Sequence, residues 1–290
     1  MEVADAPLAA VLGMLRGHGP SPKVPPPRVA SVRPPGAGYP FDDWAEIYDR
    51  VYADLTHDVP FYVQLALANA GPVLELGCGT GRVSLAMAEA GVNVLGIDIS
   101  PLMAARANAK AAARGLGWRA AFQADDMRTL RLERTFGLVV MPFRSLQLVT
   151  TPSDQRAVLA TAAAHLATGG TLAFDVFNPD PDLLADTGDE PFVDSIVVQP
   201  DGSVVIVHAT NRWDHAEQLS HPHLWIEEHT GEGVTLAVHE REFAMRYVHV
   251  GEMRDMLADA GFEVEAVYGG FDGEPVEDDC DDLAFVARRG

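Results

Sequence analysis

The feature that most constrains the fold is a short apolar segment that runs directly into a glycine-rich turn at residues 73–82. The segment reads Val-Leu-Glu-Leu-Gly-Cys-Gly-Thr-Gly-Arg. Its glycines, Gly77, Gly79 and Gly81, let the backbone approach a ligand without obstruction by Cβ atoms. The helix expected after the turn offers free amide groups at its N-terminus, where polar ligands bind readily. The segment therefore predicts a strand, a ligand-binding turn and a helix.

The spacing of these glycines argues against two common nucleotide sites. A dinucleotide fingerprint needs its third glycine at position 82, where this sequence has Arg82. A phosphate-cradling P-loop needs Gly-Lys-Ser or Gly-Lys-Thr, and neither follows the turn. A nicotinamide cofactor is therefore disfavoured.

Apolar strands alternate with helical patterns from residue 72 to residue 177. One helix is expected to begin with Ser100 as N-cap and Pro101 as first residue, and a later one to end at Gly169 and Gly170. Further along, another helix is stopped by Gly261. Such alternation predicts an α/β fold with a doubly wound, mostly parallel seven-stranded sheet. The expected strands are residues 73–76, 92–97, 119–123, 138–141, 171–177, 262–268 and 283–288.

Residues 1–40 are rich in proline, at a density that excludes regular helix or sheet, and are expected to form a tail. Order is expected to begin at Asp42 or Asp43, either of which suits a helix N-cap. Apolar residues then recur at helical spacing. They are Trp44, Ile47, Tyr48, Val51 and Leu55, and a second helix is expected over residues 61–69.

The pattern changes character between the two parts of the predicted core, residues 41–178 and 248–290. Strand-like runs at 196–198 and 204–207 flank the turn Pro200-Asp201-Gly202, and two longer runs lie around residues 230–233. Residues 179–247 are therefore expected to form an inserted antiparallel sheet. This insert either roofs the ligand site or forms a surface between two copies of the chain, so a homodimer stays open.

The charge balance bears on possible partners. The chain has 42 acidic and 21 basic residues and a formal net charge of -21, which repels phosphate backbones and anionic membrane surfaces. It contains neither a signal-peptide pattern nor a run of about 18 apolar residues. Cys78 and Cys280 belong to no C-x-x-C pair. We therefore expect a cytoplasmic protein without a membrane segment, a nucleic-acid partner or a disulfide framework.

Two further acidic positions suit a ligand that contains an adenosine group. Asp98 ends the second expected strand, where its carboxylate can accept both hydroxyls of a ribose, and Ser100 already serves as the helix cap. After the third strand, Asp126 offers a carboxylate to an adenine amino group, and Met127 offers a thioether to lie against the ring.

Together these residues resemble the class I S-adenosylmethionine-dependent methyltransferases, over roughly residues 41–178 and 248–290. The run E-L-G-C-G-T-G carries most of the resemblance, and Asp126-Met127 is similar to the adenine-binding "GDM" segment of small-molecule N-methyltransferases. One departure is Phe136-Gly137-Leu138-Val139, where the family usually has "FDLV". The resemblance implies S-adenosylmethionine as cofactor, bound at its methionine end, ribose and adenine by Glu75, Gly77, Cys78, Gly79, Gly81, Asp98, Ile99, Asp126, Met127 and Met141.

The acceptor should bind beside the carboxyl ends of the strands, where ligands of open α/β sheets lie. Since a sulfonium methyl group needs no metal or covalent intermediate, positioning supplies much of the rate, and no catalytic residue is assigned. Expected acceptor contacts are Phe143, Arg144, Gln147 and Phe177. Arg144 either pairs an acidic group of the acceptor or forms a salt bridge within the chain. Gln147 either orients the acceptor or caps a turn.

Aromatic and histidine residues leave further alternatives open. Tyr48 and Tyr52 lie one helical turn apart and resemble the cofactor lid of similar methyltransferases, although Tyr48 equally suits the core. Seven of the ten histidines lie between residues 208 and 249. In a strand, alternate residues from His221 to His229 would share one face, and Pro222 indicates an edge strand. A solvated or dimer surface is favoured over a metal site there, and the acidic residues 272–282 do not fit EF-hand spacing.

The leading functional prediction is methyl transfer to nitrogen or oxygen of a small-molecule metabolite. The acidic charge favours a cationic or neutral acceptor. Methylation of carbon is the alternative reaction, and it needs a base, for which His223, Tyr247 and His249 are the candidates. A non-catalytic cofactor-binding protein of the same fold is the remaining alternative.

Overall fold

The computed structural model describes residues 41–179, 181–185 and 190–290, and the predicted proline-rich tail lies outside them. The described residues form two compact units. The first, here the core unit, contains residues 41–46, Leu55–Leu183 and Met245–Gly290. The second, here the sheet unit, contains Ile47–Asp54 and Leu184–Ala244. All predicted site residues except Tyr48 and Tyr52 belong to the core unit.

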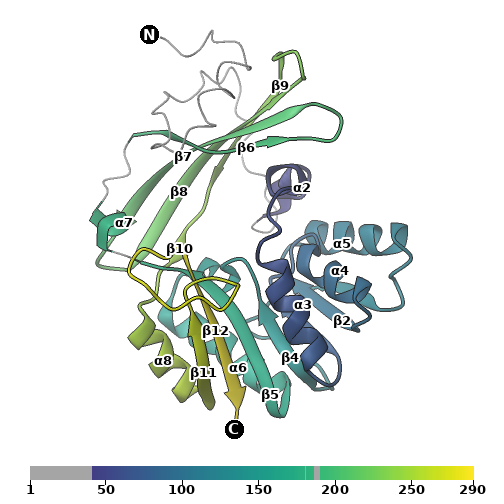
Figure 1. Ribbon diagram of the computed structural model, residues 1–290, viewed down its shortest axis with the longest axis vertical. Coiled ribbons are helices and arrows are strands. Elements are labelled where there is room, and N and C mark those ends of the chain that lie inside the picture. The colour runs from purple at the N-terminus through teal and green to yellow at the C-terminus, as the bar shows by residue number, and fades with distance from the viewer. Residues whose placement is uncertain (1–40, 180, 186–189) are drawn as a thin grey trace. The chain divides into compact units, whose positions relative to one another are not determined.

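The core unit is built on a seven-stranded sheet in the order β11-β12-β5-β4-β1-β2-β3 (Figure 1). Strands β1 to β5 are parallel, and β12 is antiparallel to both of its neighbours. The predicted doubly wound α/β fold is therefore confirmed. The strands are β1 Val73–Leu76, β2 Val94–Asp98, β3 Ala120–Ala124, β4 Phe136–Met141, β5 Leu166–Phe177, β11 Phe262–Tyr268 and β12 Asp282–Arg289.

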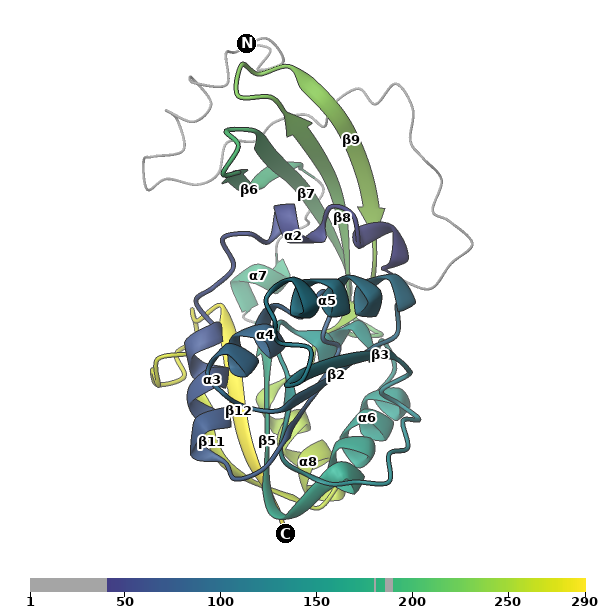
Figure 2. The same ribbon diagram turned by 90° about the vertical axis from the view of Figure 1, so that its right-hand side faces the viewer.

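Helices cover both faces of this sheet, and in Figure 2 α3 and α6 lie on opposite sides of it. Successive side chains of a strand point to opposite faces, so Val73 packs with α3 and α4 while Leu74 packs with α6 and α8. This burial on both faces explains why the strands are apolar throughout. No helix among the described residues is long and apolar enough to cross a membrane. The helices are α3 Val59–Ala68, α4 Arg82–Glu89, α5 Pro101–Ala113, α6 Pro152–His165 and α8 Val250–Asp259.

The predicted start of α5 is confirmed. The Ser100 hydroxyl accepts a hydrogen bond from the amide of Met103 at 3.1 Å, and Pro101 is the first helical residue. Gly261, with φ 85°, follows the end of α8 as expected.

The predicted continuous helix at the start of the described chain is wrong. The structure has a 3₁₀ helix, η2, at Asp42–Trp44 and a separate single turn, α2, at Tyr48–Val51. The residue before η2, Phe41, is left-handed and makes no side-chain cap. Trp44, Ile47 and Val51 are nevertheless buried. The helical spacing of these apolar residues therefore reflects their burial along a series of turns, and it does not indicate a continuous helix.

The glycine pair expected to end α6 lies inside β5 instead. The helix ends at His165 and the strand begins at Leu166 without a loop. A Cβ atom at Gly170 would lie 2.9 Å from the carbonyl oxygen of Ala167. This glycine therefore serves close backbone packing within the strand.

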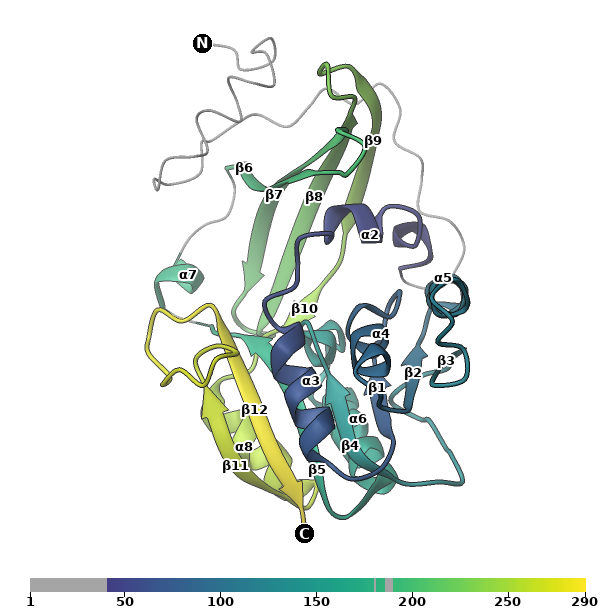
Figure 3. The ribbon, with the colours of Figure 1, turned by 45° about the vertical axis from the view of Figure 1, so that its right-hand side comes forward.

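The sheet unit contains the predicted antiparallel sheet, with strands β6 Phe192–Val198, β7 Val204–Asp214, β8 Leu219–His229 and β9 Thr235–Glu242. Figure 3 shows β7 and β8 side by side along their length. The expectation that Pro222 marks an edge strand is wrong, because β8 lies between β7 and β9. The proline fits there because pairing with β9 ends at His223, directly beside it. The remaining short elements are η3 Ser145–Leu148, α7 Pro181–Ala185 and β10 Met245–Arg246.

Candidate functional site

The glycine-rich turn lies where the order of the sheet reverses. β1 pairs with β2 on one side and with β4 on the other, which makes its carboxyl end the topological switch point at which α/β sheets bind ligands. Gly77, Gly79 and Gly81 all have positive φ, at 75°, 52° and 83°. A Cβ atom at Gly77 would lie 2.7 Å from the Cβ of Ser145. The turn therefore requires glycine, and it brings bare backbone to the edge of the sheet.

Asp98 ties this turn to the end of β2. One carboxylate oxygen accepts the amide of Gly79 at 2.7 Å, and the other accepts the amide of Ser100 at 2.9 Å. Burial raises the pKa of the Asp98 carboxyl, and the side chain keeps part of its surface exposed. Each carboxylate oxygen has a further lone pair, so the group can still accept hydroxyl donors from a ligand. Ile99 follows directly and is partly buried.

Asp126 and Met127 follow the carboxyl end of β3, the next strand of the sheet. The Arg128 guanidinium donates to both oxygens of Asp126, with the shortest distance 2.6 Å, and these hydrogen bonds lower the pKa of Asp126. Arg128 also reaches Asp154 at 3.1 Å. Met127 packs partly buried against the core. The Asp126 carboxylate is therefore engaged by Arg128, and its contact with an adenine amino group stays a prediction.

Glu75 lies inside β1, and its side chain contacts α4. The residue is 2% exposed, and the Ser84 hydroxyl donates to its carboxylate. Burial raises the pKa of Glu75 to about 7, against an ordinary value of 4.5. A direct contact of Glu75 with the methionine end of a cofactor stays a prediction.

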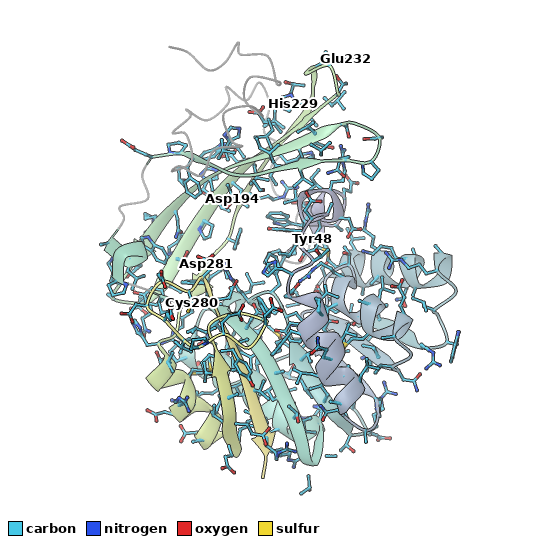
Figure 4. The ribbon with its side chains drawn as sticks, in the orientation of Figure 1. Tyr48, Asp194, His229, Glu232, Cys280 and Asp281 are labelled. Carbon is cyan, nitrogen blue, oxygen red and sulfur yellow. The ribbon has the colours of Figure 1, made fainter. Side chains whose placement is uncertain are left out.

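The loop after β4 carries two of the predicted acceptor residues. Met141 ends the strand and is fully buried, and Phe143 and Arg144 both adopt left-handed backbone conformations, with φ 55° and 60°. The Arg144 guanidinium donates to Asp282 through Nε at 2.8 Å and Nη2 at 2.7 Å. Its Cζ lies 5.7 Å from the centre of the Phe177 ring. Of the two alternatives for Arg144, the salt bridge within the chain is the one present. Figure 4 marks Cys280 and Asp281, which directly precede Asp282.

Gln147 is fully buried and neither caps its own turn nor reaches the surface. Its side-chain oxygen accepts the amide of Phe177 at 2.9 Å, which joins η3 to the end of β5. The Phe177 ring lies 6.4 Å from that of Tyr247, whose ring is 5.8 Å from His249. The core unit thus brings the rings of Phe177 and Tyr247 together, and Gln147 holds the backbone of Phe177 through its hydrogen bond.

Tyr48 and Tyr52 belong to the sheet unit, in and directly after α2. Their ring centres are 4.7 Å apart, so the two tyrosines form one aromatic pair. The neighbouring Arg50 forms an ion pair with Glu228 and donates to the Ser203 hydroxyl at 2.9 Å. These contacts anchor α2 to the sheet of the same unit. A lid role for the pair stays a prediction.

The histidines of β8 alternate along one face of the strand, as expected, and several are paired with glutamate. His229 contacts Glu227 at 2.7 Å, and His223 contacts Glu240 at 2.6 Å (Figure 4 marks His229). Within the part of the chain that the structure describes, no cluster of three or more histidine, cysteine or acidic residues could hold a metal ion. A 390 Å³ pocket lies over this part of the sheet unit, and its lining includes Arg212, His221 and Glu242.

Sequence reasoning missed a buried polar cluster behind the turn. Asp175 accepts hydrogen bonds from the Tyr62 hydroxyl and from two amides of the loop after β4. Asp58, at the start of α3, pairs with Arg82, the first residue of α4, at 2.7 Å. One signal was available, because Asp175 interrupts the otherwise apolar run Phe-Asp-Val-Phe of a buried strand.

Comparisons with known proteins bear on this arrangement. A methyltransferase-domain family profile matches residues 73–170. A cypemycin N-terminal methyltransferase from a Streptomyces species is 30% identical over 217 residues, 75% of this chain and 82% of that protein. The dTDP-3-amino-3,4,6-trideoxy-alpha-D-glucopyranose N,N-dimethyltransferase of Streptomyces venezuelae is 26% identical, over 80% of this chain and 94% of its own. Among solved structures, the CcbJ methyltransferase of Streptomyces caelestis matches with a TM-score of 0.68 and 26% identity, over 80% of this chain and 95% of that one.

Proposed function

Because this chain belongs to the class I S-adenosylmethionine-dependent methyltransferases, we propose that it methylates a nitrogen or oxygen atom of a small molecule, with an amine as preferred acceptor. The observation that carries the proposal is the meeting of the glycine turn, the Asp98 carboxylate and the loop after β4 at one edge of the sheet. We further propose that the protein acts in the cytoplasm and without a nucleic-acid partner, since it has a net charge of -21 and its two cysteines are free.

The residues at the turn fit S-adenosylmethionine. Gly77, Gly79 and Gly81 leave the backbone open to the methionine end, and the remaining lone pairs of Asp98 suit the two ribose hydroxyls. Ile99, Asp126 and Met127, which follow the next strands of the sheet, suit the adenine. When bound there, S-adenosylmethionine supplies an electrophilic sulfonium methyl group.

The chain's own contribution is to place the acceptor. Phe143 is partly exposed at the carboxyl edge, Phe177 and Tyr247 are buried with their rings 6.4 Å apart, and Gln147 holds the backbone of Phe177 in place. The Arg144–Asp282 pair flanks the Phe177 ring and presents both charges together, which suits a polar acceptor without a net negative charge. Rate enhancement by such positioning requires no metal.

Two further observations favour an amine. The two relatives described above are, by name, methyltransferases that act on nitrogen, one at a peptide N-terminus and one at an amino sugar. The net charge of -21 also raises the local concentration of cationic molecules near the surface. Only the neutral form of an amine carries the lone pair that methyl transfer needs, so a protonated amine attracted to this surface must first release its proton to water, after which orientation suffices.

The test is formation of S-adenosylhomocysteine by the purified full chain, measured by mass spectrometry with matched acceptors. An amino sugar nucleotide, a peptide with a free N-terminus and the hydroxyl analogue of each form the panel. We expect turnover with an amine that exceeds its hydroxyl analogue at least about tenfold. Equal turnover would contradict the preference for nitrogen.

If no turnover is found, isothermal titration with S-adenosylhomocysteine shows whether the chain fails to bind the cofactor or binds it without catalysis. Absence of binding would refute the proposed cofactor contacts. Binding without turnover on the panel or on a cell extract would favour the non-catalytic alternative. Asp98→Asn removes the charge and turns an NH2 donor toward the amide of Gly79 or of Ser100, so this variant should bind S-adenosylhomocysteine more weakly if Asp98 belongs to the cofactor site.

A further inference from the structure

The loop between β4 and η3, residues 142–144, holds a strained conformation without glycine. Phe143 and Arg144 are consecutive residues with φ 55° and 60°. Side chains other than glycine rarely adopt this region, and a pair of them persists only where neighbouring groups enforce it.

The Asp175 carboxylate is the group that enforces it. It lies near the carboxyl end of β5 and is 1% exposed. One oxygen accepts the amide of Phe143 at 2.7 Å, and the other accepts the amide of Arg144 at 2.9 Å. Two successive amides converging on one anion form a backbone nest, here filled by a side chain of the same chain. The Tyr62 hydroxyl, from α3, donates to the same carboxylate at 2.6 Å.

On its other side the same loop contacts the glycine turn. The Ser145 hydroxyl has the carbonyl of Pro142 as its nearest acceptor at 2.7 Å and lies 3.3 Å from the carbonyl of Gly77, and its Cβ occupies the space that a side chain at position 77 would need. The Arg82 guanidinium, which Asp58 holds, lies 5.6 Å from the centre of the Phe143 ring. A shift of the loop therefore moves a wall of the turn as well as the side chains of Phe143 and Arg144.

We propose that Asp175 is a positioning residue, whose carboxylate holds Phe143 and Arg144 in the left-handed conformation that keeps Ser145 against Gly77. The consequence for ligand binding rests on the proposed function, because the turn is where the cofactor should bind. Asp175 itself is buried behind the loop, so it acts through the loop and not on a reacting atom.

The pKa of Asp175 gives this role a pH dependence. Burial raises the pKa of the Asp175 carboxyl to about 6. The charged and titratable groups that act on it are Tyr62 on α3, Asp58 directly before α3, Arg144 on the loop and Asp282 on β12, while Arg82 on α4 acts on Tyr62. The carboxyl binds its proton more tightly in the closed loop than it would in water, so proton uptake favours the closed loop. Protection of the two loop amides should therefore rise as the pH falls through about 6.

The test compares Asp175→Asn with Tyr62→Phe. Asparagine keeps the shape but turns its side-chain NH2 donor toward the amide of Phe143 or of Arg144, whereas Tyr62→Phe removes one hydrogen bond and leaves both amide contacts. Both variants lose a buried hydrogen bond, so both should lower the melting temperature. Hydrogen exchange at the amides of Phe143 and Arg144 and titration with S-adenosylhomocysteine are then measured for each.

We expect Asp175→Asn to speed exchange at both amides and weaken S-adenosylhomocysteine binding, each by about tenfold or more, and Tyr62→Phe to change affinity by less than about threefold. Equal effects in the two variants, or none in Asp175→Asn, would overturn the proposal. If Asp175→Asn does not fold, exchange in the wild type decides: after correction for the intrinsic pH dependence, protection at the two amides should rise as the pH falls from about 7.5 to 5, and unchanged protection would overturn the proposal. If the wild type does not bind S-adenosylhomocysteine, the proposed function fails. The hydrogen-exchange rates at Phe143 and Arg144 still test whether Asp175 holds the loop.

Discussion

Replacement of Glu75 by glutamine should make the protein more stable at neutral and alkaline pH, although Glu75 lies in the motif that defines the cofactor turn. The carboxyl group is fully buried in β1, and its hydrogen-bond partner is the Ser84 hydroxyl. Glutamine has the same shape, can accept the same hydrogen bond and carries no charge at any pH. The variant therefore removes only the cost of an ionised group in the core.

The sign and size of the effect follow from the raised pKa of Glu75. The folded protein holds the proton up to about pH 7, whereas the unfolded chain releases it near 4.5. Wild-type stability therefore falls as the pH rises through this window, and the full penalty is present above about pH 7. The distance between the two pKa values corresponds to about 3 kcal/mol. The advantage of Glu75→Gln should grow from near zero at about pH 4.5 to about 3 kcal/mol at pH 8.

Urea unfolding at about pH 5 and pH 8, followed by circular dichroism, measures this difference. The midpoint should rise in the variant at the higher pH with little change in slope. Glu89→Gln is the matched control, because Glu89 lies on α4 with an exposed carboxylate and should change stability by less than about 0.5 kcal/mol at either pH. An advantage of Glu75→Gln that is the same at both pH values would refute the reasoning, since it would mean that Glu75 ionises at the same pH in both states.

Three further predictions concern the ligand and the acceptor loop. S-adenosylhomocysteine should raise the melting temperature while NAD and ATP do not, because the turn has neither the dinucleotide spacing nor a P-loop lysine; an equal shift with NAD would contradict the assignment. Asp98→Ala should weaken S-adenosylhomocysteine binding by roughly 10- to 150-fold in isothermal titration, since bonds to a charged acceptor contribute about 1.5 to 3 kcal/mol. Asp125→Ala should change that affinity less than about threefold, and a large loss would place the adenine contact one residue earlier. Arg144→Met should cost less than about 1 kcal/mol in urea unfolding, because the pair with Asp282 is partly exposed, and a larger loss would show that the pair supports the fold.

The fold could be predicted from the sequence where the signal was local and repeated. The buried parallel strands are mostly apolar, with Glu75 and Asp175 as exceptions, and the Ser100-Pro101 start of α5 depends only on neighbouring residues. The first helix was misjudged because helical spacing of apolar residues also arises in a chain of turns that buries the same residues. Pro222 was misjudged because its tolerance depends on where β9 ends, which lies some twenty residues further along the chain.

The candidate site likewise combines local features that the sequence predicts with long-range contacts that it does not. The glycine turn and the position of Asp98 depend on residues close in sequence, and both lie at the switch point as the motif indicates. Asp175 could not be linked to Phe143 from the sequence, because register across the sheet brings the ends of β4 and β5 together. The partner of Arg144 could not be predicted either, since Asp282 lies 138 residues further along the chain.

The place of β12 in the sheet has a consequence for biosynthesis. This strand lies between β5 and β11, and it follows β5 only after the whole sheet unit and α8. A growing chain on the ribosome can pair β1 to β5 early, but the edge of β5 stays open until residues 282–289 have been made. Closure of so long a segment is slow, and an open apolar strand edge invites pairing with other chains. Translation past β5 is thus the stage at which this strand edge is most open to pairing with other chains.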